Sequence, residues 1–163
     1  MPTRIKNYAF IDGQNLHMGM RDSGIALDFR KFRIYMQEKY NVFAAYYFIG
    51  YMQENQSLYE MLQRAGYVLQ FKEVSKDHTG KAKGNVDVDL TLRVVDKLPE
   101  YDRAVLVTND GDFASVVTYL IGKGKFEKVL SPNRAKCSYL LRKAAKGHID
   151  YLDEARGKIE RKK

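Results

Sequence analysis

The chain has 163 residues, of which 45% are hydrophobic and 29% charged, and it contains one cysteine, Cys137. A chain of this length fits one domain and buries roughly two-thirds of the surface that its unfolded state exposes, so it needs neither a disulfide nor a metal merely to fold. No run approaches the roughly 18 consecutive apolar residues of a membrane span, and the N-terminus lacks the apolar core of a signal peptide. We therefore expect a cytoplasmic protein with no membrane partner, in which Cys137 is a small packing residue of a helix.

The sequence is basic, with 28 Lys and Arg against 20 Asp and Glu and a formal net charge of +8 at pH 7. Such an excess favours polyanionic partners, nucleic acid first, although simple solubility explains the charge equally well. Part of the excess lies in the terminal stretch RGKIERKK, Arg156 to Lys163. We expect one domain over residues 1–155 and a frayed basic tail over residues 156–163, which adds affinity without specificity.

Apolar runs rich in aromatic and β-branched residues alternate along the chain with helical patterns, which is typical of a parallel sheet with helices on its faces. The sequence therefore predicts an α/β fold. In chain order, the predicted strands are Tyr8–Ile11, Val42–Ile49, Tyr67–Val74, Arg103–Thr108, Lys128–Leu130 and Ile149–Leu152. The predicted helices are Leu16–Met20, Phe29–Lys39, Gln56–Arg64, Val86–Leu98, Phe113–Ile121 and Ala135–Ala145.

Two of the predicted strands lead directly into carboxylates. The first apolar run ends at Asp12 in YAFIDGQN, and the run RAVLVTNDGDF leads into Asp110 and Asp112, one on each side of a glycine. Because the ends of parallel strands lie at the same edge of a sheet, we expect these three carboxylates to be neighbours. The alternative is helix capping, which Asp112 alone would satisfy. Since one helix needs only one cap, Asp110 is left for another role.

A third acidic group lies at the start of the predicted helix Val86–Leu98, in KGNVDVDL. Asp87 is in the first turn, where the helix dipole stabilises its charge. On an ideal helix Asp89 points about 200° away from Asp87, so the two side chains cannot face one site. We choose Asp87, because the site must lie at the start of this helix, and we assign Asp89 to a supporting or surface position. Asp96, more than two turns from the helix start, is expected to be solvated.

Carboxylates drawn from different strand ends suit a hard cation, so Mg²⁺ or Mn²⁺ fits them better than zinc. Crowded carboxylates repel one another, and they destabilise the fold unless cations bind or some of the groups hold protons. This cost favours a functional interpretation. The candidate metal ligands are Asp12, Asp87, Asp110 and Asp112, and we expect no small-molecule organic cofactor.

Three segments, FIDGQN (Phe10–Asn15), KGNVDVDL (Lys83–Leu90) and VLVTNDGDF (Val105–Phe113), resemble the signature blocks of the NYN domain family, in its LabA-like branch, within the PIN-like nuclease superfamily. Their order, spacing and structural setting all match, and the resemblance covers roughly Lys6 to Leu152. It implies a single-domain, Rossmann-like three-layer sandwich with an acidic site at the C-terminal edge of a mostly parallel sheet. It also implies metal-dependent ribonuclease chemistry.

The resemblance implies a role for each matching residue. Carried over by position, the catalytic residues are Asp12 as the first-strand ligand, Asn15 as its polar companion, Asp87 as the helix carboxylate, and Asp110 and Asp112 as the pair after the fourth strand. One departure bears on the number of metals. Many members of this branch carry a further acidic residue in the helix after Asp87, where this chain has Arg93, or Asp96 after a small shift of register.

The implied reaction is hydrolysis of an RNA phosphodiester bond. One or two Mg²⁺ or Mn²⁺ ions would lower the pKa of a bound water, direct it at the phosphorus and screen the developing charge, while Asn15 positions substrate or a metal-bound water. Lys81 and Lys83, in a glycine-bearing loop, are expected to contact backbone phosphates, unless they belong only to a solvated basic loop. Tyr51, near a strand end, is a candidate for stacking on an unpaired base.

Other functions fit parts of the pattern. DVDLT, Asp87 to Thr91, matches the D-x-D-x-T of haloacid-dehalogenase-like phosphatases, but that motif needs its first aspartate at the tip of a buried strand near the start of the domain. Toprim domains also use D-x-D after a strand, but they need an early glutamate where this chain has IDGQN. An RNA-binding or interaction module, with the same four aspartates and no turnover, stays open. The sequence also leaves the oligomeric state open, a homodimer included.

Overall fold

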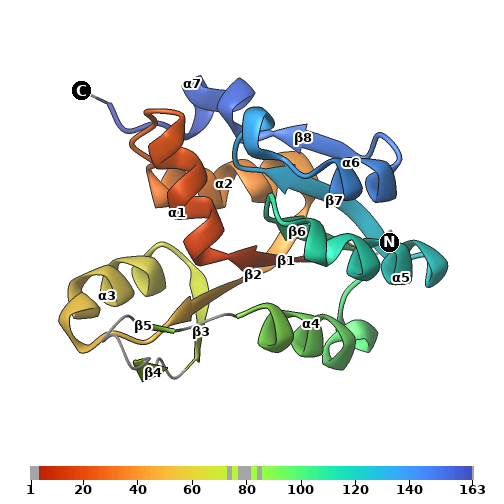
Figure 1. Ribbon diagram of the computed structural model, residues 1–163, viewed down its shortest axis with the longest axis horizontal. Coiled ribbons are helices and arrows are strands. Elements are labelled where there is room, and N and C mark those ends of the chain that lie inside the picture. Colours follow the sequence, from red (N-terminus) through yellow and green to blue (C-terminus); the bar gives the residue numbers. More distant parts are fainter. Residues whose placement is uncertain (1–3, 73–74, 77–81, 84–85, 163) are drawn as a thin grey trace.

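The computed structural model describes residues 4–72, 75–76, 82–83 and 86–162. Its centre is a six-stranded sheet in which every neighbouring pair is parallel, in the order β3-β2-β1-β6-β7-β8 (Figure 1). The strands of this sheet are β1 (Asn7–Asp12), β2 (Val42–Gly50), β3 (Tyr67–Lys72), β6 (Ala104–Val107), β7 (Phe126–Ser131) and β8 (Ile149–Tyr151). A separate antiparallel pair is formed by β4 (Ser75–Lys76) and β5 (Ala82–Lys83). The predicted α/β fold with a parallel sheet is confirmed.

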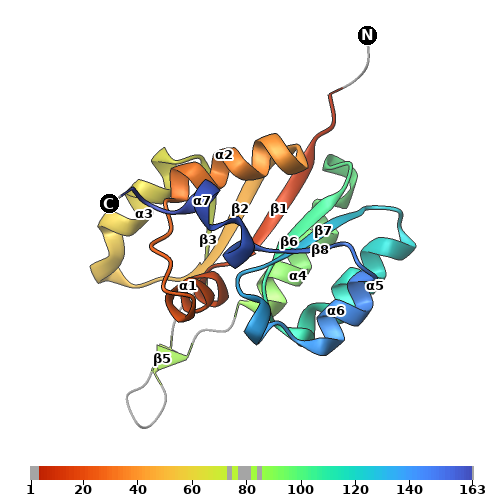
Figure 2. The same cartoon turned by 90° about the horizontal axis from the view of Figure 1, so that it is seen from above.

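Helices cover both faces of the sheet and complete the three layers. The α-helices are α1 (Gly13–Asp22), α2 (Phe29–Tyr40), α3 (Gln56–Arg64), α4 (Asp87–Asp96), α5 (Ala114–Gly122), α6 (Tyr139–Ala145) and α7 (Arg156–Ile159). Short 3-10 helices are η1 (Gln53–Asn55), η2 (Leu98–Glu100), η3 (Gly111–Phe113), η4 (Arg134–Lys136) and η5 (Leu152–Ala155). Helices α1, α2, α3 and α7 lie on one face, and α4, α5 and α6 lie on the other (Figure 2). Within the described ranges, no helix has the length and apolar character needed to cross a membrane.

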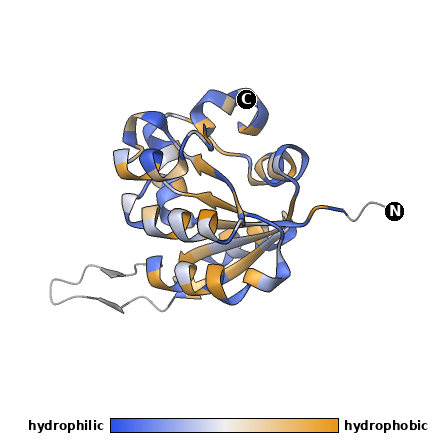
Figure 3. Ribbon diagram, turned by 90° about the vertical axis from the view of Figure 1, so that its right-hand side faces the viewer, coloured by the Kyte–Doolittle hydropathy of each residue, from blue (hydrophilic) through white to orange (hydrophobic). Residues whose placement is uncertain are grey.

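The central strand β1 is buried on both faces. Ala9 and Ile11 belong to the core beneath α2, whereas Tyr8 and Phe10 belong to the core beneath α4. The strands of a parallel sheet that is covered on both sides are continuous apolar runs in the sequence, because neither face of the sheet is exposed to water. Figure 3 shows these apolar strands between the two helical layers. The same property is what makes the strands recognisable in the sequence.

The strand order reverses next to β1. Strands β2 and β3 lie on one side of β1, and β6, β7 and β8 lie on the other, with Ile11 paired to Val107 across the junction. Crossover connections that leave toward opposite sides open a crevice at the carboxyl ends of the two central strands, where ligands of doubly wound sheets bind. Asp12 ends β1 at this point, and the segment that carries Asp110 follows β6. The fold therefore creates the crevice at the predicted carboxylates.

The expectation of a frayed C-terminal tail is wrong for residues 156–162. Residues Arg156–Ile159 form α7, and the side chain of Ile159 is fully buried in the core beneath α2. The backbone is held too, because Asp28 N donates to Ile159 O at 2.8 Å and Arg161 N donates to Ala26 O at 2.8 Å. The charges of this stretch favour a solvated tail, but one apolar residue, Ile159, anchors it to the core.

Several element boundaries also differ from the prediction, two of which bear on named residues. The helix predicted over Ala135–Ala145 begins later, at α6, and Ser138 caps it with a side chain that accepts from the backbone of the helix. Cys137 lies before this cap in an extended conformation, so it is buried in the core beneath α4 without belonging to a helix. Strand β3 ends at Lys72, and Val74, the predicted end, lies outside the described residues.

Candidate active site

Asp12 links the end of β1 to the start of α1. Its side chain is only 6% exposed, and its Oδ1 atom accepts a hydrogen bond from the backbone N of Asn15 at 3.2 Å, which caps the helix. The other oxygen, Oδ2, accepts from Thr108 Oγ1 at 3.5 Å. Because Thr108 directly follows β6, this contact spans the two central strands. Asp12 is thus held in one orientation, at the switch point of the sheet.

Gly13 explains why the apolar run of β1 is followed by an aspartate and then a glycine. A Cβ atom at this position would lie 2.5 Å from Tyr47 Cε1 and 2.7 Å from the backbone oxygen of Phe48. Real Cβ atoms do not approach other atoms so closely, and the backbone oxygen of a sheet strand has little freedom to move. Glycine therefore lets α1 start hard against the end of β2, directly after Asp12.

Asn15 ties the two central strand ends together. Its side-chain oxygen accepts a hydrogen bond from the backbone N of Asn109 at 2.6 Å, across 94 positions of the chain. The side-chain oxygen of Asn109 in turn accepts from Ser131 Oγ on β7. Thr108 Oγ1 also accepts from Asp110 N at 3.1 Å. These bonds fix the segment after β6, and Thr108 and Asn109 are the site residues that the sequence reasoning missed.

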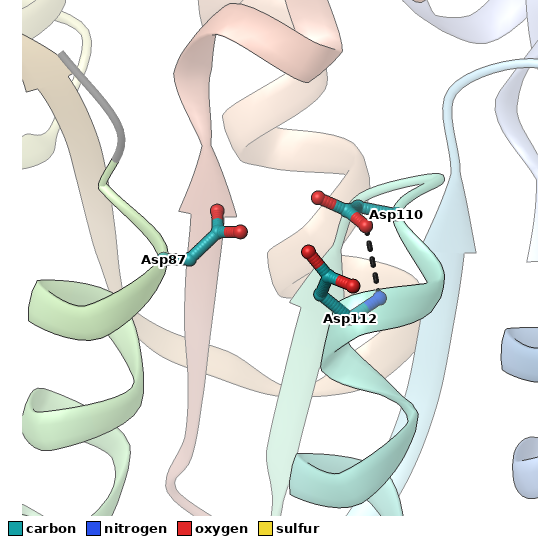
Figure 4. Close-up of side chains that lie close together, drawn as sticks. All are labelled: Asp87, Asp110 and Asp112. Atoms are coloured by element: carbon teal, nitrogen blue, oxygen red, sulfur yellow. Dashed lines mark hydrogen bonds between the residues drawn. The ribbon is translucent and has the colours of Figure 1, made fainter.

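Asp110 caps η3, the short helix that leads into α5. Its Oδ1 atom accepts a hydrogen bond from the backbone N of Asp112 at 2.9 Å, drawn as the dashed line in Figure 4. The sequence-based alternative, in which Asp112 is the cap, is therefore not what the structure shows. Gly111 between them is required by packing, since a Cβ atom there would lie 2.4 Å from Ser138 Oγ. The side chain of Asp110 therefore caps a helix, whereas that of Asp112 is exposed and does not serve as a cap.

Asp87 completes the cluster from the opposite side of the crevice. It is the first residue of α4, and Figure 4 shows its carboxylate turned toward those of Asp110 and Asp112. One carboxylate oxygen from each of these three residues can be chosen so that all three atoms lie within 4.8 Å of one another. Oxygen ligands at this mutual separation suit a hard cation held between them. The three residues come from two elements that meet only in the folded chain.

Asp12 is a neighbour of this cluster and not one of its three members. A cavity of about 290 Å³ is lined by Asp12, Asp87 and Asp110, together with Gln14, Asn15, Met18 and Val86. The structure thus brings Asp12, Asn15, Asp87 and Asp110 to one cavity, and Asp112 is close to Asp87 and Asp110 without lining it.

The electrostatics of the cavity appear most clearly at Asp12. The pKa of Asp12 is raised from its ordinary value of 3.8 to about 6, chiefly by burial. The negative charges of Asp87 and Asp110 contribute to this rise, whereas the hydrogen bonds from Asn15 and Thr108 oppose it. Without a cation, burial together with the repulsion from the neighbouring carboxylates therefore keeps a proton on part of the Asp12 side chains up to about pH 6.

The other acidic residues of α4 face away from the cluster. Asp89 lies 3.7 Å from the ammonium of Lys72 on β3, and Asp96 lies 3.3 Å from the guanidinium of Arg93. Asp89 and Asp96 both line a second cavity on the β3 side of α4. The choice of Asp87 over Asp89 agrees with this geometry, because only Asp87 faces the crevice.

Of the predicted substrate-binding residues, Tyr51 is described in full, and it does not line the acidic cavity. Tyr51 stacks on Tyr59 at 5.8 Å between ring centroids, and its hydroxyl accepts a hydrogen bond from Gln56 Nε2 at 2.8 Å. Its half-exposed ring lies just after the end of β2, at the same edge of the sheet as the crevice. Lys81 lies outside the described residues, and only the backbone of Lys83, in β5, is described. Their proposed contacts with RNA remain predictions.

A doubly wound parallel sheet with carboxylates gathered at its switch point defines a Rossmann-like α/β protein with an acidic site. The model of the NYN domain family matches residues 7–153, and the chain belongs to that family. The chain is 25% identical to the low amplitude and bright protein LabA of Synechococcus elongatus over 162 residues, which cover 93% of this chain and 86% of LabA. The predicted membership of the NYN family is confirmed.

Solved structures support the fold. A protein of unknown function from Vibrio parahaemolyticus superposes with a TM-score of 0.76 at 24% identity, covering 94% of this chain and 98% of that chain. The MAR1 ribonuclease of Caenorhabditis elegans superposes with a TM-score of 0.45 at 10% identity, covering 95% of this chain and 80% of that chain. The second likeness is too weak to carry an argument about function.

Proposed function

We propose that this protein is a metal-dependent endoribonuclease that hydrolyses RNA phosphodiester bonds at the acidic cluster. The observation that carries the proposal is the convergence of Asp87, Asp110 and Asp112 within 4.8 Å at the switch point of an NYN fold. The net charge of +8 supports it, because a basic protein attracts polyanions such as RNA. A negatively charged cluster in a basic protein is a poor site for a bare phosphate and a good one for a cation that meets a phosphate.

The donor set fits a hard divalent cation. Asp87, Asp110 and Asp112 would hold Mg²⁺ or Mn²⁺, with Asp12 beside them in the same cavity. When bound, such an ion lowers the pKa of a coordinated water and screens the charge that develops on the phosphoryl oxygens. Neutralisation of the crowded carboxylates by the ion also removes their mutual repulsion.

Hydrogen bonds from neighbouring residues hold the carboxylates of the cluster in position. Thr108 hydrogen-bonds both Asp12 and the backbone of Asp110, and Asn15 holds the backbone of Asn109, so the segment after β6 cannot move away from β1. Asn15 also lines the cavity, where it is placed to contact substrate beside this structural bond. Fixed dipoles and charges that need no rearrangement during the reaction are the main source of catalysis at such sites.

The experiment is a cleavage assay on single-stranded and structured RNA with Mg²⁺ or Mn²⁺, comparing wild type with Asp112→Asn. Asp112 is the best residue to replace, because Asp110 also caps η3. Replacement of Asp110 could lower activity through a loss of stability as well as through a loss of catalysis. We expect Asp112→Asn to slow cleavage by roughly two orders of magnitude or more. Asp22→Asn, a surface carboxylate at the end of α1, is the matched control and should cleave like wild type.

Metal binding is measured separately from cleavage. Addition of Mn²⁺ to chelator-treated protein should raise the melting temperature of wild type, since a ligand that binds only the folded state stabilises it. The rise should be smaller for Asp112→Asn and unchanged for Asp22→Asn. Equal rises in all three proteins would place the ion elsewhere and contradict the proposed site.

A catalytically inactive RNA-binding module of the same fold is the second candidate. It is favoured by Arg93, which stands where the family resemblance leads one to expect a further acidic residue and which pairs with Asp96. Wild-type protein that binds RNA but cleaves neither substrate with either metal would decide for this function. Either outcome leaves RNA as the partner.

A further inference from the structure

A cavity of about 620 Å³ lies between α2, α3 and the C-terminal segment, which Figure 2 shows beside these two helices. Its cationic side chains are Arg30 on α2, Arg64 on α3 and Arg161, and we call it the arginine cavity. We propose that the arginine cavity holds a backbone phosphate of the RNA strand whose scissile phosphodiester lies at the acidic cluster. This inference rests on the function proposed above and adds a phosphate subsite to it.

The arginines of this cavity have side chains that are available to bind an anion. The structure describes all eleven arginines of the chain, and six of them form an ion pair or donate a side-chain hydrogen bond to a described residue. The other five have no such partner among the described residues, and they are Arg4, Arg30, Arg64, Arg142 and Arg161. Three of these five line the arginine cavity. A guanidinium with unused N–H groups suits phosphate, because its planar donors match two phosphate oxygens at once.

The fold directs these arginines toward the cavity. The lining residues of α3 recur three or four positions apart, so they share one face of the helix, and they are Ser57, Glu60, Met61, Arg64 and Ala65. Leu62, which is fully buried in the core beneath α2, lies about 200° around the helix from Arg64. Arg64 therefore points away from the core. Arg161 is held by its backbone N, which donates to Ala26 O at 2.8 Å, so the docked C-terminal segment brings a further charge to the cavity.

The carboxylates of the cavity do not cancel its positive charge. Asp28 caps α2, because its Oδ1 atom accepts a hydrogen bond from the backbone N of Lys31 at 3.0 Å. Glu60 is the second carboxylate, so the lining has two acidic residues against three arginines and a net charge of +1. The acidic cavity, in contrast, is lined by three carboxylates and by no cationic side chain. A phosphate is therefore attracted to the arginine cavity directly, whereas at the acidic cavity it needs a metal ion.

A smaller cavity of about 240 Å³ lies between the arginine cavity and α1. It shares Phe29 and Arg161 with the arginine cavity, and its lining on α1 includes His17 and Arg21. The opposite side of α1 lines the acidic cavity. A single helix thus separates the acidic cavity from the two cavities that Arg161 lines.

The outer surface of α1 offers a path between the two sides. At about 100° per residue, Met18, Gln14, Arg21 and His17 follow one another around the helix, from the acidic cavity to the smaller cavity. All four side chains are exposed, and none of them is a carboxylate. A strand held at the carboxylates can therefore cross α1 and reach the arginine cavity without meeting a negative charge on this path.

The test measures RNA affinity in chelator, where no cleavage occurs, over a range of salt concentrations. Arg30→Ala combined with Arg64→Ala should make the slope of log affinity against log salt shallower by about 0.7 if the two arginines share one phosphate, and by about 1.4 if each holds its own. Arg30→Lys combined with Arg64→Lys keeps both charges and should restore most of the slope. This second variant separates the loss of charge from any damage to the fold.

The matched control is Arg4→Ala combined with Arg142→Ala. These two arginines also have no ion-pair partner among the described residues, so the control removes the same charge. Arg4 precedes β1 at the sheet edge opposite Asp12, and Arg142 is on α6 in the other helical layer, so neither lines the arginine cavity. The slope of the control should equal that of wild type. An unchanged slope in the Arg30 and Arg64 alanine variant, or an equal change in the control, would overturn the phosphate subsite.

Cleavage with Mn²⁺ shows whether the strand in the arginine cavity is the one that is cut. Because these arginines contact substrate far from the reacting phosphate, the alanine variant should raise KM several-fold and leave kcat nearly unchanged. A shallower slope with an unchanged KM would mean that the cavity holds another strand, which would overturn the proposal.

Inorganic phosphate is the other source of the same chemistry. If it raises the melting temperature of wild type but not that of the alanine variant, while the RNA slopes of the two proteins are equal, the cavity binds free phosphate and the proposal falls.

The subsite and the nuclease function fail in different ways. If wild type cleaves RNA with Mn²⁺ while the alanine variant keeps the slope and KM of wild type, the nuclease function stands and the phosphate subsite falls. If the slope depends on Arg30 and Arg64 but wild type cleaves nothing with either metal, the cavity binds RNA and the nuclease function falls. Wild-type protein that does not bind RNA would overturn both.

Discussion

Asp12 contributes to the stability of the fold and to the electrostatics of the site at the same time. Its Oδ1 atom caps α1, and its burial next to Asp87 and Asp110 raises its pKa to about 6. A capping carboxylate in isolation would stabilise the folded state. Here the same carboxylate is desolvated and repelled by its neighbours, so its charge destabilises the folded chain in the absence of a cation. Stability and function are in conflict at this residue.

This conflict predicts an unusual pH dependence. Between pH 3.8 and about 6, the folded state retains a proton on Asp12 that the unfolded chain has released. The contribution of Asp12 to the free energy of unfolding therefore falls as the pH rises through this window, and the loss is complete above it. The two pKa values correspond to a difference of about 3 kcal/mol. Urea unfolding of chelator-treated protein at pH 5 and pH 8 measures the part of this loss that falls above pH 5, which is about half of it.

Asp12→Asn isolates this contribution. The amide keeps an oxygen for the cap but cannot ionise, so the variant should lose less stability than wild type between pH 5 and pH 8, and it should be the more stable protein at pH 8. Asp22→Asn, on the same helix, should follow wild type. If Asp12→Asn and wild type lose the same stability over this range, the carboxylate of Asp12 is not the group responsible.

The carboxylates of the site were predictable from the sequence, whereas the residues that hold them in place by hydrogen bonds were not. Asp12, Asp87 and Asp110 follow from two local rules, that parallel strands end at one edge and that a helix start favours an anion. Thr108 and Asn109 are also adjacent to a strand end, but their tasks depend on contacts with residues of β1 and α1 that are 96 and 94 positions away. No local pattern encodes such bonds. The choice between Asp110 and Asp112 as the cap likewise depends on backbone geometry.

At the scale of elements, α7 is the helix that the sequence pattern does not predict. Ile159 is its only fully buried side chain, set in a stretch of basic residues, and the bridge between Leu27 and Glu160 holds the chain directly after it. Apolar periodicity over four residues is too short to predict a helix. The long strands and helices were predictable because their apolar patterns extend over many more residues.

Docking of α7 predicts a specific loss of stability. Ile159→Ala should lower the free energy of unfolding by about 2 to 4 kcal/mol, because it removes a fully buried side chain from the core beneath α2. Lys158→Ala, one position earlier and exposed, should change it by about 0.5 kcal/mol at most. Urea unfolding measures both. Equal stability of Ile159→Ala and wild type would mean that the tail does not dock in solution.

At the scale of the whole molecule, the net positive charge and the acidic cluster serve different purposes. The acidic side chains Asp12, Asp87, Asp110 and Asp112 gather at one edge of the sheet, although the chain as a whole carries a net charge of +8. A long polyanion is attracted by the overall charge, whereas only a cation can enter the acidic cluster. Affinity for RNA and turnover should therefore depend on different residues, and substitutions can separate them.

Replacement of Lys81 and Lys83 by alanine tests this separation. If both lysines contact phosphates, RNA affinity should fall, and the slope of log affinity against log salt should become shallower by about 1.4, since each phosphate contact with a single strand contributes about 0.7. The rise in melting temperature with Mn²⁺ should stay as in wild type, because the acidic cluster is untouched. Lys123→Ala with Lys143→Ala removes the same charge from exposed positions at the end of α5 and in α6, and it should leave the slope nearly unchanged. Equal changes of slope in the two double variants would show that RNA responds only to net charge, and Lys81 and Lys83 would then have no specific role in binding.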